Sequence, residues 1–386
     1  MEEFDKIRPF DNNEVEGVMN DLLNEKEFFH ALAKVQFPRF TKLFPNLSTS
    51  ITKKALKKKI LEIKSIEQVQ DIVCVQMEKL FKRTADQVTQ EGLNKLSNDD
   101  SYLFISNHRD IVMDPAVIGY FLLTSNHKTC EVAIGDNLLK KKYISDLMRL
   151  NKCFIVNRSA VGREKLFALK NLSAYIHHAI EKKNNIWIAQ SEGRAKNGKD
   201  KTDPAIIKMF HMGRKDVDKK LNINEDLSRL NIVPVSISYE YDPCDRMKAE
   251  ELYAIATEGE FIKDETTDEK SIATGINGFK GDIHVQYGNV IDIQEDNAVH
   301  IAELIDEQII GNYKLFPSNY LAYEILQKKD ENIGSQLNET GLNPKITEEK
   351  RLFFEERYNS FPDHLKPYFL EMYGNPVVSV LSASTN

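Results

Sequence analysis

The sequence has few cysteines and no long apolar run. Its four cysteines (Cys74, Cys130, Cys153 and Cys244) are far apart and form neither a Cys-x-x-Cys pair nor a Cys/His cluster with zinc spacing. This pattern predicts reduced, buried thiols and no zinc site. The longest apolar runs, such as residues 117–123, fall well short of the about 18 residues needed to cross a bilayer. The acidic N-terminal segment also lacks an apolar signal region. We therefore expect a cytoplasmic protein, with peripheral contact at the inner face of the membrane left open.

An excess of basic residues is lacking as well. The 386 residues carry a formal net charge of -7, which argues against a dedicated nucleic-acid binder. With 41% hydrophobic and 29% charged residues, the composition is that of an ordinary globular protein. Local basic segments could still bind anionic substrates. One such segment is residues 52–64, "TKKALKKKILEIK", which we interpret as a solvated helix face or as a contact with an anionic membrane.

The periodicity of apolar residues divides the chain into three regions. Residues 1–95 show three- and four-residue spacing, which predicts a helical N-terminal region. Residues 96–296 alternate short apolar runs with helical segments, which predicts an α/β domain with a mostly parallel central sheet flanked by helices. Residues 297–386 return to a helical pattern and predict a helical C-terminal extension. The expected strands lie at residues 101–106, 130–135, 153–158, 186–190, 232–240 and 283–291.

The segment "SNHRDIVMDP", residues 106–115, follows the first expected strand. Asp114 and Pro115 stand before an apolar-periodic run, and aspartate with a following proline is a typical helix start. We therefore expect Asp114 to be the N-cap and residues 109–113 to form a loop. This arrangement makes Asp114 the partner of His108, with Asp110 as the alternative.

Polar side chains also follow three later strands. Because the carboxyl ends of parallel strands lie on one edge of a sheet, we expect these side chains to meet there. Arginine forks and glycine turns suit a phosphate group. We interpret Ser236 and Tyr239, within the fifth expected strand, as packing. The remaining candidates are Arg158, Glu192, Gly193, Arg194, Lys196 and Lys199.

Taken together and in order, these segments resemble the phospholipid/glycerol acyltransferase family. The four matching blocks are "NHRDIVMD", "CFIVNR", "SEGRAKNGK" and "IVPVSISYE", between about residues 100 and 292. Two departures stand out. Five residues separate His108 from Asp114 where the family usually has four, and Arg194 follows Gly193 directly, which leaves the family's arginine role to Arg194 or Lys196.

The resemblance implies a glycerol-3-phosphate acyltransferase-like fold and transfer of an acyl group from an acyl thioester. His108 would act as general base and Asp114 would orient it. Arg158 and Arg194, supported by Lys196 or Lys199, would bind the acceptor phosphate, while Glu192 and Gly193 would shape the turn. No metal or other cofactor is implied; the donor would be acyl-CoA or an acyl carrier protein thioester.

Several functions remain open at this point. The helical N-terminal region favours glycerol-3-phosphate as acceptor, and 1-acylglycerol-3-phosphate or another lysolipid is the alternative. A thioester hydrolase is disfavoured because no G-x-S-x-G motif is present. The extra residue between His108 and Asp114 keeps a third possibility open, a non-catalytic lipid-binding protein on a degenerate acyltransferase fold.

Overall fold

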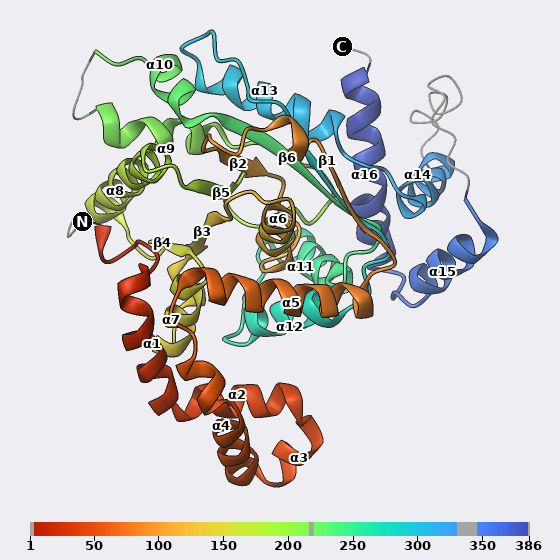
Figure 1. Ribbon diagram of the computed structural model, residues 1–386. Helices are drawn as coiled ribbons and strands as arrows, with labels where there is room; N and C mark the ends of the chain where they lie inside the picture. Colours follow the sequence, from red (N-terminus) through yellow and green to blue (C-terminus); the bar gives the residue numbers. More distant parts are fainter. Residues whose placement is uncertain (1–3, 216–219, 330–345, 385–386) are drawn as a thin grey trace. The chain divides into compact units, whose positions relative to one another are not determined.

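The computed structural model describes residues 4–215, 220–329 and 346–384 (Figure 1). The chain divides into two compact units. The first comprises Met1–Gln76 and Glu131–Asn171, and the second comprises Met77–Cys130 and Leu172–Asn386.

The first unit is built mainly from helices. Its core contains Val15, Leu22 and Phe29 from the N-terminal helices together with Leu150, all buried. Pro38 and Pro45 each begin a helix, where the missing N–H costs nothing. The elements are α1 (Asn12–Asn24), α2 (Lys26–Gln36), α3 (Pro38–Leu43), α4 (Pro45–Leu61), most of α5 (Ile66–Thr84), β3 (Cys130–Gly135), η3 (Asp136–Leu138), α7 (Lys142–Leu150), β4 (Cys153–Val156) and the start of α8 (Gly162–Glu181). Strands β3 and β4 pair in parallel.

The second unit contains five strands in the order β1-β7-β6-β2-β5: β1 (Val88–Glu91), β2 (Leu103–Ser106), β5 (Asn185–Ala189), β6 (Ile232–Tyr239) and β7 (Ile283–Tyr287). All neighbours pair in parallel except β6 and β7, which are antiparallel. Every residue of β2 and β6 is buried, as expected for parallel strands covered on both faces. The carboxyl ends of β2, β5 and β6 therefore lie on the same edge.

Helices complete the second unit. They are η2 (Leu93–Lys95), α6 (Met113–Thr124), the end of α8, α9 (Pro204–Lys215), α10 (Ile223–Leu227), η4 (Ser228–Leu230), α11 (Asp245–Glu258), α12 (Thr267–Asn277), α13 (Ala298–Gly311), α14 (Pro317–Lys329), α15 (Glu348–Asn359) and α16 (Lys366–Ser384). An aromatic core that includes Phe354, Phe369 and Tyr373 joins α15 and α16 to α11 and α14. Figure 1 shows α16 between α13 and α14.

The predicted fold class is confirmed: the sheet is mostly parallel, helices flank it, and both terminal regions are helical. Each expected strand is present. One further strand, β1, lies inside the segment 1–95 that we expected to be helical. Its residues are half-buried or exposed and largely polar, so no apolar run marks it; its pairing with β7 defines it as a strand. The domain boundaries at residues 95 and 296 stay a prediction.

Candidate active site

The loop that carries His108 is anchored to the neighbouring strand. Asn107 directly follows β2, and its fully buried side chain both accepts from Ile237 N (2.8 Å) and donates to Ile237 O (2.9 Å). The side-chain amide of Asn107 thus makes the two hydrogen bonds to β6 that the backbone of a paired strand residue would otherwise make. His108 comes next, and its side chain is 13% exposed. This arrangement presents the imidazole at the carboxyl end of β2, where a substrate can reach it.

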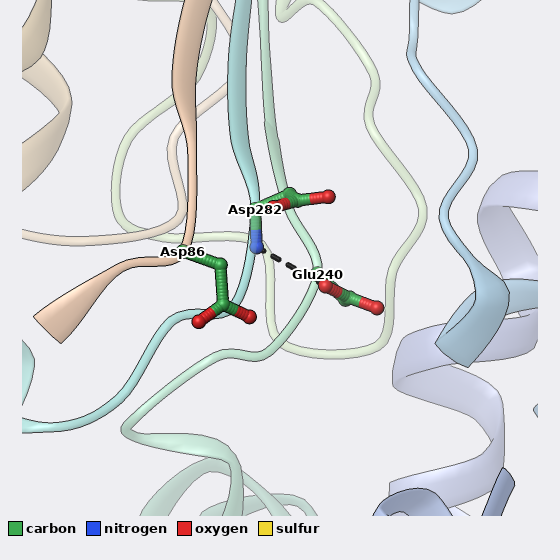
Figure 2. A group of neighbouring side chains, drawn as sticks. All are labelled: Asp86, Glu240 and Asp282. Atoms are coloured by element: carbon green, nitrogen blue, oxygen red, sulfur yellow. Dashed lines mark hydrogen bonds between the residues drawn. The ribbon is translucent and has the colours of Figure 1, made fainter. Parts of the chain in front are cut away.

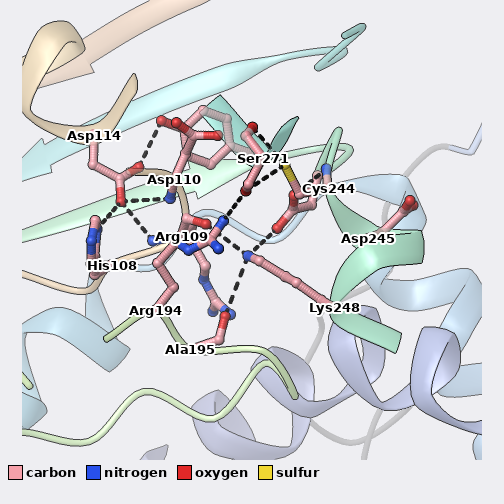
Figure 3. Close-up of polar contacts among 12 residues, drawn as sticks. His108, Arg109, Asp110, Asp114, Arg194, Ala195, Cys244, Asp245, Lys248 and Ser271 are labelled. Carbon is pink, nitrogen blue, oxygen red and sulfur yellow. Dashed lines mark hydrogen bonds and ion pairs between the residues drawn. The ribbon is translucent and has the colours of Figure 1, made fainter. Parts of the chain in front are cut away.

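The carboxylate of Asp114 orients the His108 ring through a hydrogen bond with Nδ1. Its Oδ2 atom lies 2.7 Å from Nδ1 of His108 and accepts the backbone N–H groups of Arg109 (2.6 Å) and Asp110 (2.9 Å). Its Oδ1 atom accepts the Tyr239 hydroxyl at 2.8 Å. An ionised carboxylate only accepts, so Nδ1 of His108 carries the hydrogen and Nε2 keeps its lone pair. Figure 3 shows Asp114 between His108 and the Asp110 backbone.

Burial strengthens this arrangement. Asp114 is fully buried, and the rings of His108 and Trp187 form a T-shaped pair with centroids 5.8 Å apart. Burial, followed by the negative charge of Asp114, raises the pKa of Tyr239 well above its ordinary value. The phenol therefore stays protonated and donates to Asp114 across the physiological pH range. We interpreted Tyr239 as strand packing, and the structure instead gives it a polar contact with the site.

The prediction that Asp114 is the N-cap of the following helix is wrong. Helix α6 begins at Met113, and Asp114 lies within its first turn. The capping role falls to Asp110, whose Oδ1 atom accepts the backbone N–H groups of Val112 (3.0 Å) and Met113 (2.9 Å). Pro115 is tolerated inside the helix because the first-turn N–H groups have no intrahelical acceptor. Freed from capping, Asp114 can turn back to the loop and accept from His108.

Asp110 is therefore a neighbour of the pair, and no hydrogen bond joins it to His108. Burial, followed by the nearby charge of Asp114, raises the pKa of Asp110. Its carboxylate lies so close to Gly275 of α12 that a Cβ at that position would collide with it. The five-residue spacing between His108 and Asp114 is accommodated because the intervening loop folds its own amides onto the carboxylate.

The turn after β5 reaches the same loop. The backbone N–H of Ala195 donates to the carbonyl of His108 at 2.9 Å. Gly193 has a φ of 81°, a left-handed conformation that glycine adopts without strain. Arg194 donates from Nη1 to the Ser271 hydroxyl of α12 at 2.7 Å, and Figure 3 shows this contact. The third block thus lies beside His108.

The other residues of this block differ in their surroundings. Lys196 forms an ion pair with Glu251 of α11, with 3.1 Å between Nζ and Oε1. Arg194, in contrast, bonds to the neutral Ser271 hydroxyl, and no ion pair to a carboxylate is found for it among the described residues, although its charge helps to lower the pKa of the nearby Asp242. This difference favours Arg194 over Lys196 for the arginine role. Glu192 and Lys199 are exposed.

Arg158 belongs to the first unit, where it follows β4. Its side chain is exposed, and its backbone N–H donates to Oδ1 of Asp136 at 3.0 Å. A Cβ at Gly135 would come within 3.0 Å of the Arg158 side chain, so the absence of a side chain there makes room for the arginine. Its role as a phosphate ligand stays a prediction.

A buried lysine that we did not predict joins the His108 loop to the turn. Lys248 of α11 is 2% exposed. Its ammonium donates to the carbonyl of Arg109 (2.7 Å), to the carbonyl of Ala195 (3.4 Å) and to the carboxylate of Asp242 (Figure 3). Burial alone would raise the pKa of Asp242, but the adjacent Lys248 ammonium, the Cys244 N–H and the charge of Arg194 together hold that pKa below its ordinary value.

A second buried ion pair lies under the same loop. Arg109 Nη2 is 2.5 Å from Oδ2 of Asp200, and both side chains are less than 10% exposed.

Of these buried charged residues, Asp242 could have been identified from the sequence, because it lies shortly after the end of the expected strand β6. No sequence pattern points to Lys248 or Asp200, because their partners are distant in the chain.

Three carboxylates elsewhere in the second unit come close enough together to suggest a metal site. Asp86, Glu240 and Asp282 form this group (Figure 2). However, Nζ of Lys350 lies 2.7 Å from both carboxylate oxygens of Glu240 and 3.6 Å from Oδ2 of Asp282. The lysine ammonium thus supplies the positive charge that a cation would bring. We interpret the group as an ion-pair cluster.

Comparisons with known proteins point to the same segment of the chain. Residues 87–238 match the family model Acyltransferase, a segment that includes His108, Asp114, Arg158 and the 192–199 turn. No curated protein matches the chain significantly. The crystal structure of the 1-acyl-sn-glycerophosphate (LPA) acyltransferase PlsC from Thermotoga maritima aligns over 74% of this chain and 95% of its own, at 12% identity and a TM-score of 0.37. A likeness at that level establishes no function by itself.

Within the parts of the chain that the structure describes, every helix is too short or too polar to cross a membrane.

Proposed function

Because residues 87–238 match the family model Acyltransferase, we propose that this enzyme acylates glycerol-3-phosphate. The acyl group would come from a thioester, and the product would enter glycerophospholipid synthesis. The observation that carries the proposal is the pair of His108 and buried Asp114 at the carboxyl end of β2, beside a basic glycine turn.

The pair suits general base catalysis. Asp114 fixes the Nδ1–H tautomer, so Nε2 of His108 accepts the proton of the acceptor hydroxyl as its oxygen attacks the thioester carbonyl carbon. The C–O bond forms, the C–S bond breaks, and the leaving thiolate takes the proton back from the imidazolium. Asp114 stabilises that imidazolium while it exists. Correct placement of such a base is worth roughly 10²–10⁴-fold in rate.

The acceptor phosphate requires cationic ligands. Arg194 is the first candidate, because its described partner is the neutral Ser271 hydroxyl. Arg158 would supply a second arginine fork, and Lys199 a solvated charge. Lys196 would have to exchange Glu251 for the phosphate. Beside the exposed Glu192, Gly193 lets the turn bring backbone N–H groups toward the developing oxyanion.

The donor is acyl-CoA or an acyl carrier protein thioester, and the reaction requires no further cofactor. The alternative acceptor within the same chemistry is 1-acylglycerol-3-phosphate or another lysolipid. Both would be handled by the same base and phosphate ligands. An amphiphilic product also favours an enzyme that works in the cytoplasm at the inner face of the membrane.

A donor-by-acceptor panel tests the proposal. Purified enzyme should release thiol from a long-chain acyl thioester only when a phosphorylated glycerol is present, and lysophosphatidate should appear with glycerol-3-phosphate. His108→Ala should lose at least about 10²-fold in kcat. His300→Ala, at a side chain that is 38% exposed on α13, is the matched control and should retain wild-type rates.

Normal turnover by His108→Ala would exclude the proposed base. Thiol release that does not depend on an acceptor would identify a thioester hydrolase instead, and lipid binding without turnover would identify a non-catalytic protein. A preference for 1-acylglycerol-3-phosphate would keep the mechanism and change the acceptor.

A further inference from the structure

Helix α3 and the first half of α4 in the first unit bury hydroxyl side chains and expose large apolar ones, whereas the second half of α4 packs Leu56 and Ile60 against the core. A helix on a globular protein normally buries its apolar stripe and exposes its polar face. Here Thr41 of α3 and Ser48, Thr49 and Thr52 of α4 are buried, each less than 8% exposed. The large apolar side chains of the same stretch point outward instead. They are Phe37, Phe40, Leu43, Phe44, Leu47 and Ile51, between 38% and 72% exposed.

Hydrogen bonds hold the buried hydroxyls inside. Thr41 donates to the carbonyl of Ala33 in α2 at 2.9 Å, and Ser48 and Thr49 donate to the carbonyl of Pro45 at 2.9 and 2.7 Å. These contacts satisfy three hydroxyls that would be costly to bury alone, whereas the buried Thr52 hydroxyl has no hydrogen-bond partner among the described residues. The bonds of Ser48 and Thr49 lie within α4, so they do not fix its rotation. The bond from Thr41 to Ala33 and the 3.3 Å contact between Oγ1 of Thr49 and Nδ1 of His30 reach α2, and a rotation that covered the apolar residues would break both.

The exposed apolar residues form one continuous surface. Leu47 and Ile51 are four residues apart and therefore lie on one side of α4, while Phe40 lies on α3 and Phe44 at the junction of the two helices. The rings of Phe40 and Phe44 confirm the alignment, since their centroids are 5.4 Å apart although a single residue separates the two helices. We call this surface, with Phe37 and Leu43, the α3–α4 face.

The charge of the α3–α4 segment is almost entirely positive, although Oε1 of Glu62, just after it, lies 3.9 Å from Nζ of Lys58. Residues 37–61 contain seven basic residues and no acidic residue, in a chain whose net charge is -7. Lys54 and Lys58 continue the apolar stripe three and seven residues after Ile51, and both are exposed. The basic residues are Arg39, Lys42, Lys53, Lys54, Lys57, Lys58 and Lys59.

We propose that the α3–α4 face inserts into the headgroup layer of an anionic phospholipid bilayer. Large apolar side chains beside lysines with long aliphatic stems are typical of helices that lie in a membrane interface. A second copy of the chain is a poor occupant, because it would bring another seven positive charges to the contact. An acidic protein would match the charge, but the six apolar side chains are each 38–72% exposed, and a fluid apolar layer can surround them without a complementary folded surface.

Vesicle co-sedimentation without substrate tests this proposal, so its outcome is independent of the proposed reaction. We expect binding to vesicles of phosphatidylcholine with 30% phosphatidylglycerol, a fraction chosen for the assay, and roughly tenfold weaker binding to phosphatidylcholine alone. Phe44→Ser/Leu47→Ser/Ile51→Ser should weaken binding to both compositions at least about tenfold, because apolar insertion is lost. Lys54→Glu/Lys58→Glu should weaken only binding to the anionic vesicles, again about tenfold or more.

Matched control variants distinguish binding through the α3–α4 face from nonspecific adsorption to vesicles. Ile262→Ser alters an apolar side chain that is 81% exposed in the second unit, and Lys182→Glu/Lys208→Glu makes the same charge change in that unit. Lys182 directly follows α8, Lys208 lies on α9, and both are exposed. Both controls should bind vesicles like wild type. All variants should keep wild-type circular dichroism and thermal unfolding, because each altered side chain is exposed. Wild-type vesicle binding by the apolar triple variant would overturn the proposal, as would a wild-type protein that ignores anionic vesicles but binds an acidic carrier protein or dimerises through this face.

Discussion

Asp114→Asn is the sharpest perturbation of the candidate site, because it changes charge with little change in shape. Three N–H groups converge on Oδ2 of Asp114, from His108, Arg109 and Asp110. An asparagine will therefore place its one carbonyl oxygen at the Oδ2 position. Its amino group then occupies the Oδ1 position and donates to the Tyr239 hydroxyl oxygen, which can accept as well as donate. The orientation of the imidazole survives the substitution.

What disappears is the negative charge that stabilises the imidazolium in the transition state. We expect kcat to fall roughly 10²–10⁴-fold, the range for loss of a working base. This corresponds to about 3–5 kcal/mol of activation free energy. KM should change little, because Asp114 is fully buried and contacts no substrate. The unfolding free energy should fall by only about 1–3 kcal/mol, the range for a disturbed hydrogen bond to a charged group.

The assay is the initial rate of thiol release from an acyl thioester with saturating acceptor, followed against enzyme that is folded by circular dichroism. Asp110→Asn is the control. Asparagine caps a helix as well as aspartate does, so the bonds to Val112 and Met113 persist and kcat should fall less than about tenfold. A folded Asp114→Asn enzyme with a kcat within twofold of wild type would refute the reasoning. A larger loss of kcat in Asp110→Asn than in Asp114→Asn would refute it as well.

The remaining predictions concern residues around the pair. Tyr239→Phe leaves a buried carboxylate oxygen without its donor, so the unfolding free energy should fall by about 1.5–3 kcal/mol and kcat by about tenfold; unchanged urea denaturation and kcat would contradict this. Lys248→Met leaves the charge of Asp242 buried and unpaired, at a cost of about 3–5 kcal/mol. Adding Asp242→Asn should restore part of that loss in urea denaturation, and a purely additive double variant would contradict the pairing. Arg158→Ala should raise KM for glycerol-3-phosphate about tenfold or more with kcat and stability unchanged, because losing a charged hydrogen bond costs that much and the side chain is exposed. An unchanged KM would remove Arg158 from the phosphate site.

The sheet could be predicted from sequence because buried parallel strands are themselves apolar runs. Every residue of β2 and β6 is buried, so the signal lies within each segment and needs no knowledge of its neighbours. Strand β1 shows the limit of this reasoning. It is short, partly exposed and polar, and only its pairing with β7 makes it a strand.

The contact between His108 and Asp114 was also within reach of the sequence, because both residues lie in one short loop. The error over the N-cap came from treating Asp114 and Pro115 as a helix start, when proline is equally tolerated elsewhere in the first turn. The residues that escaped prediction are those whose partners are distant. Lys248 meets Arg109 and Asp242 through tertiary folding alone, and a lone lysine in a helix carries no signal of burial.

Helices α3 and α4 show most clearly why periodicity does not decide function. Helical spacing gives a face of threonines and serines and a face of phenylalanines, leucines and isoleucine, but not which of the two is buried. The usual rule assigns the apolar face to the core, and the lysine run then becomes a solvated surface. The bond from Thr41 to Ala33 reverses that assignment, because a hydroxyl bonded to α2 must face inward. The lysines then flank an exposed apolar surface, and the combination of the two favours a membrane contact that neither feature supports alone.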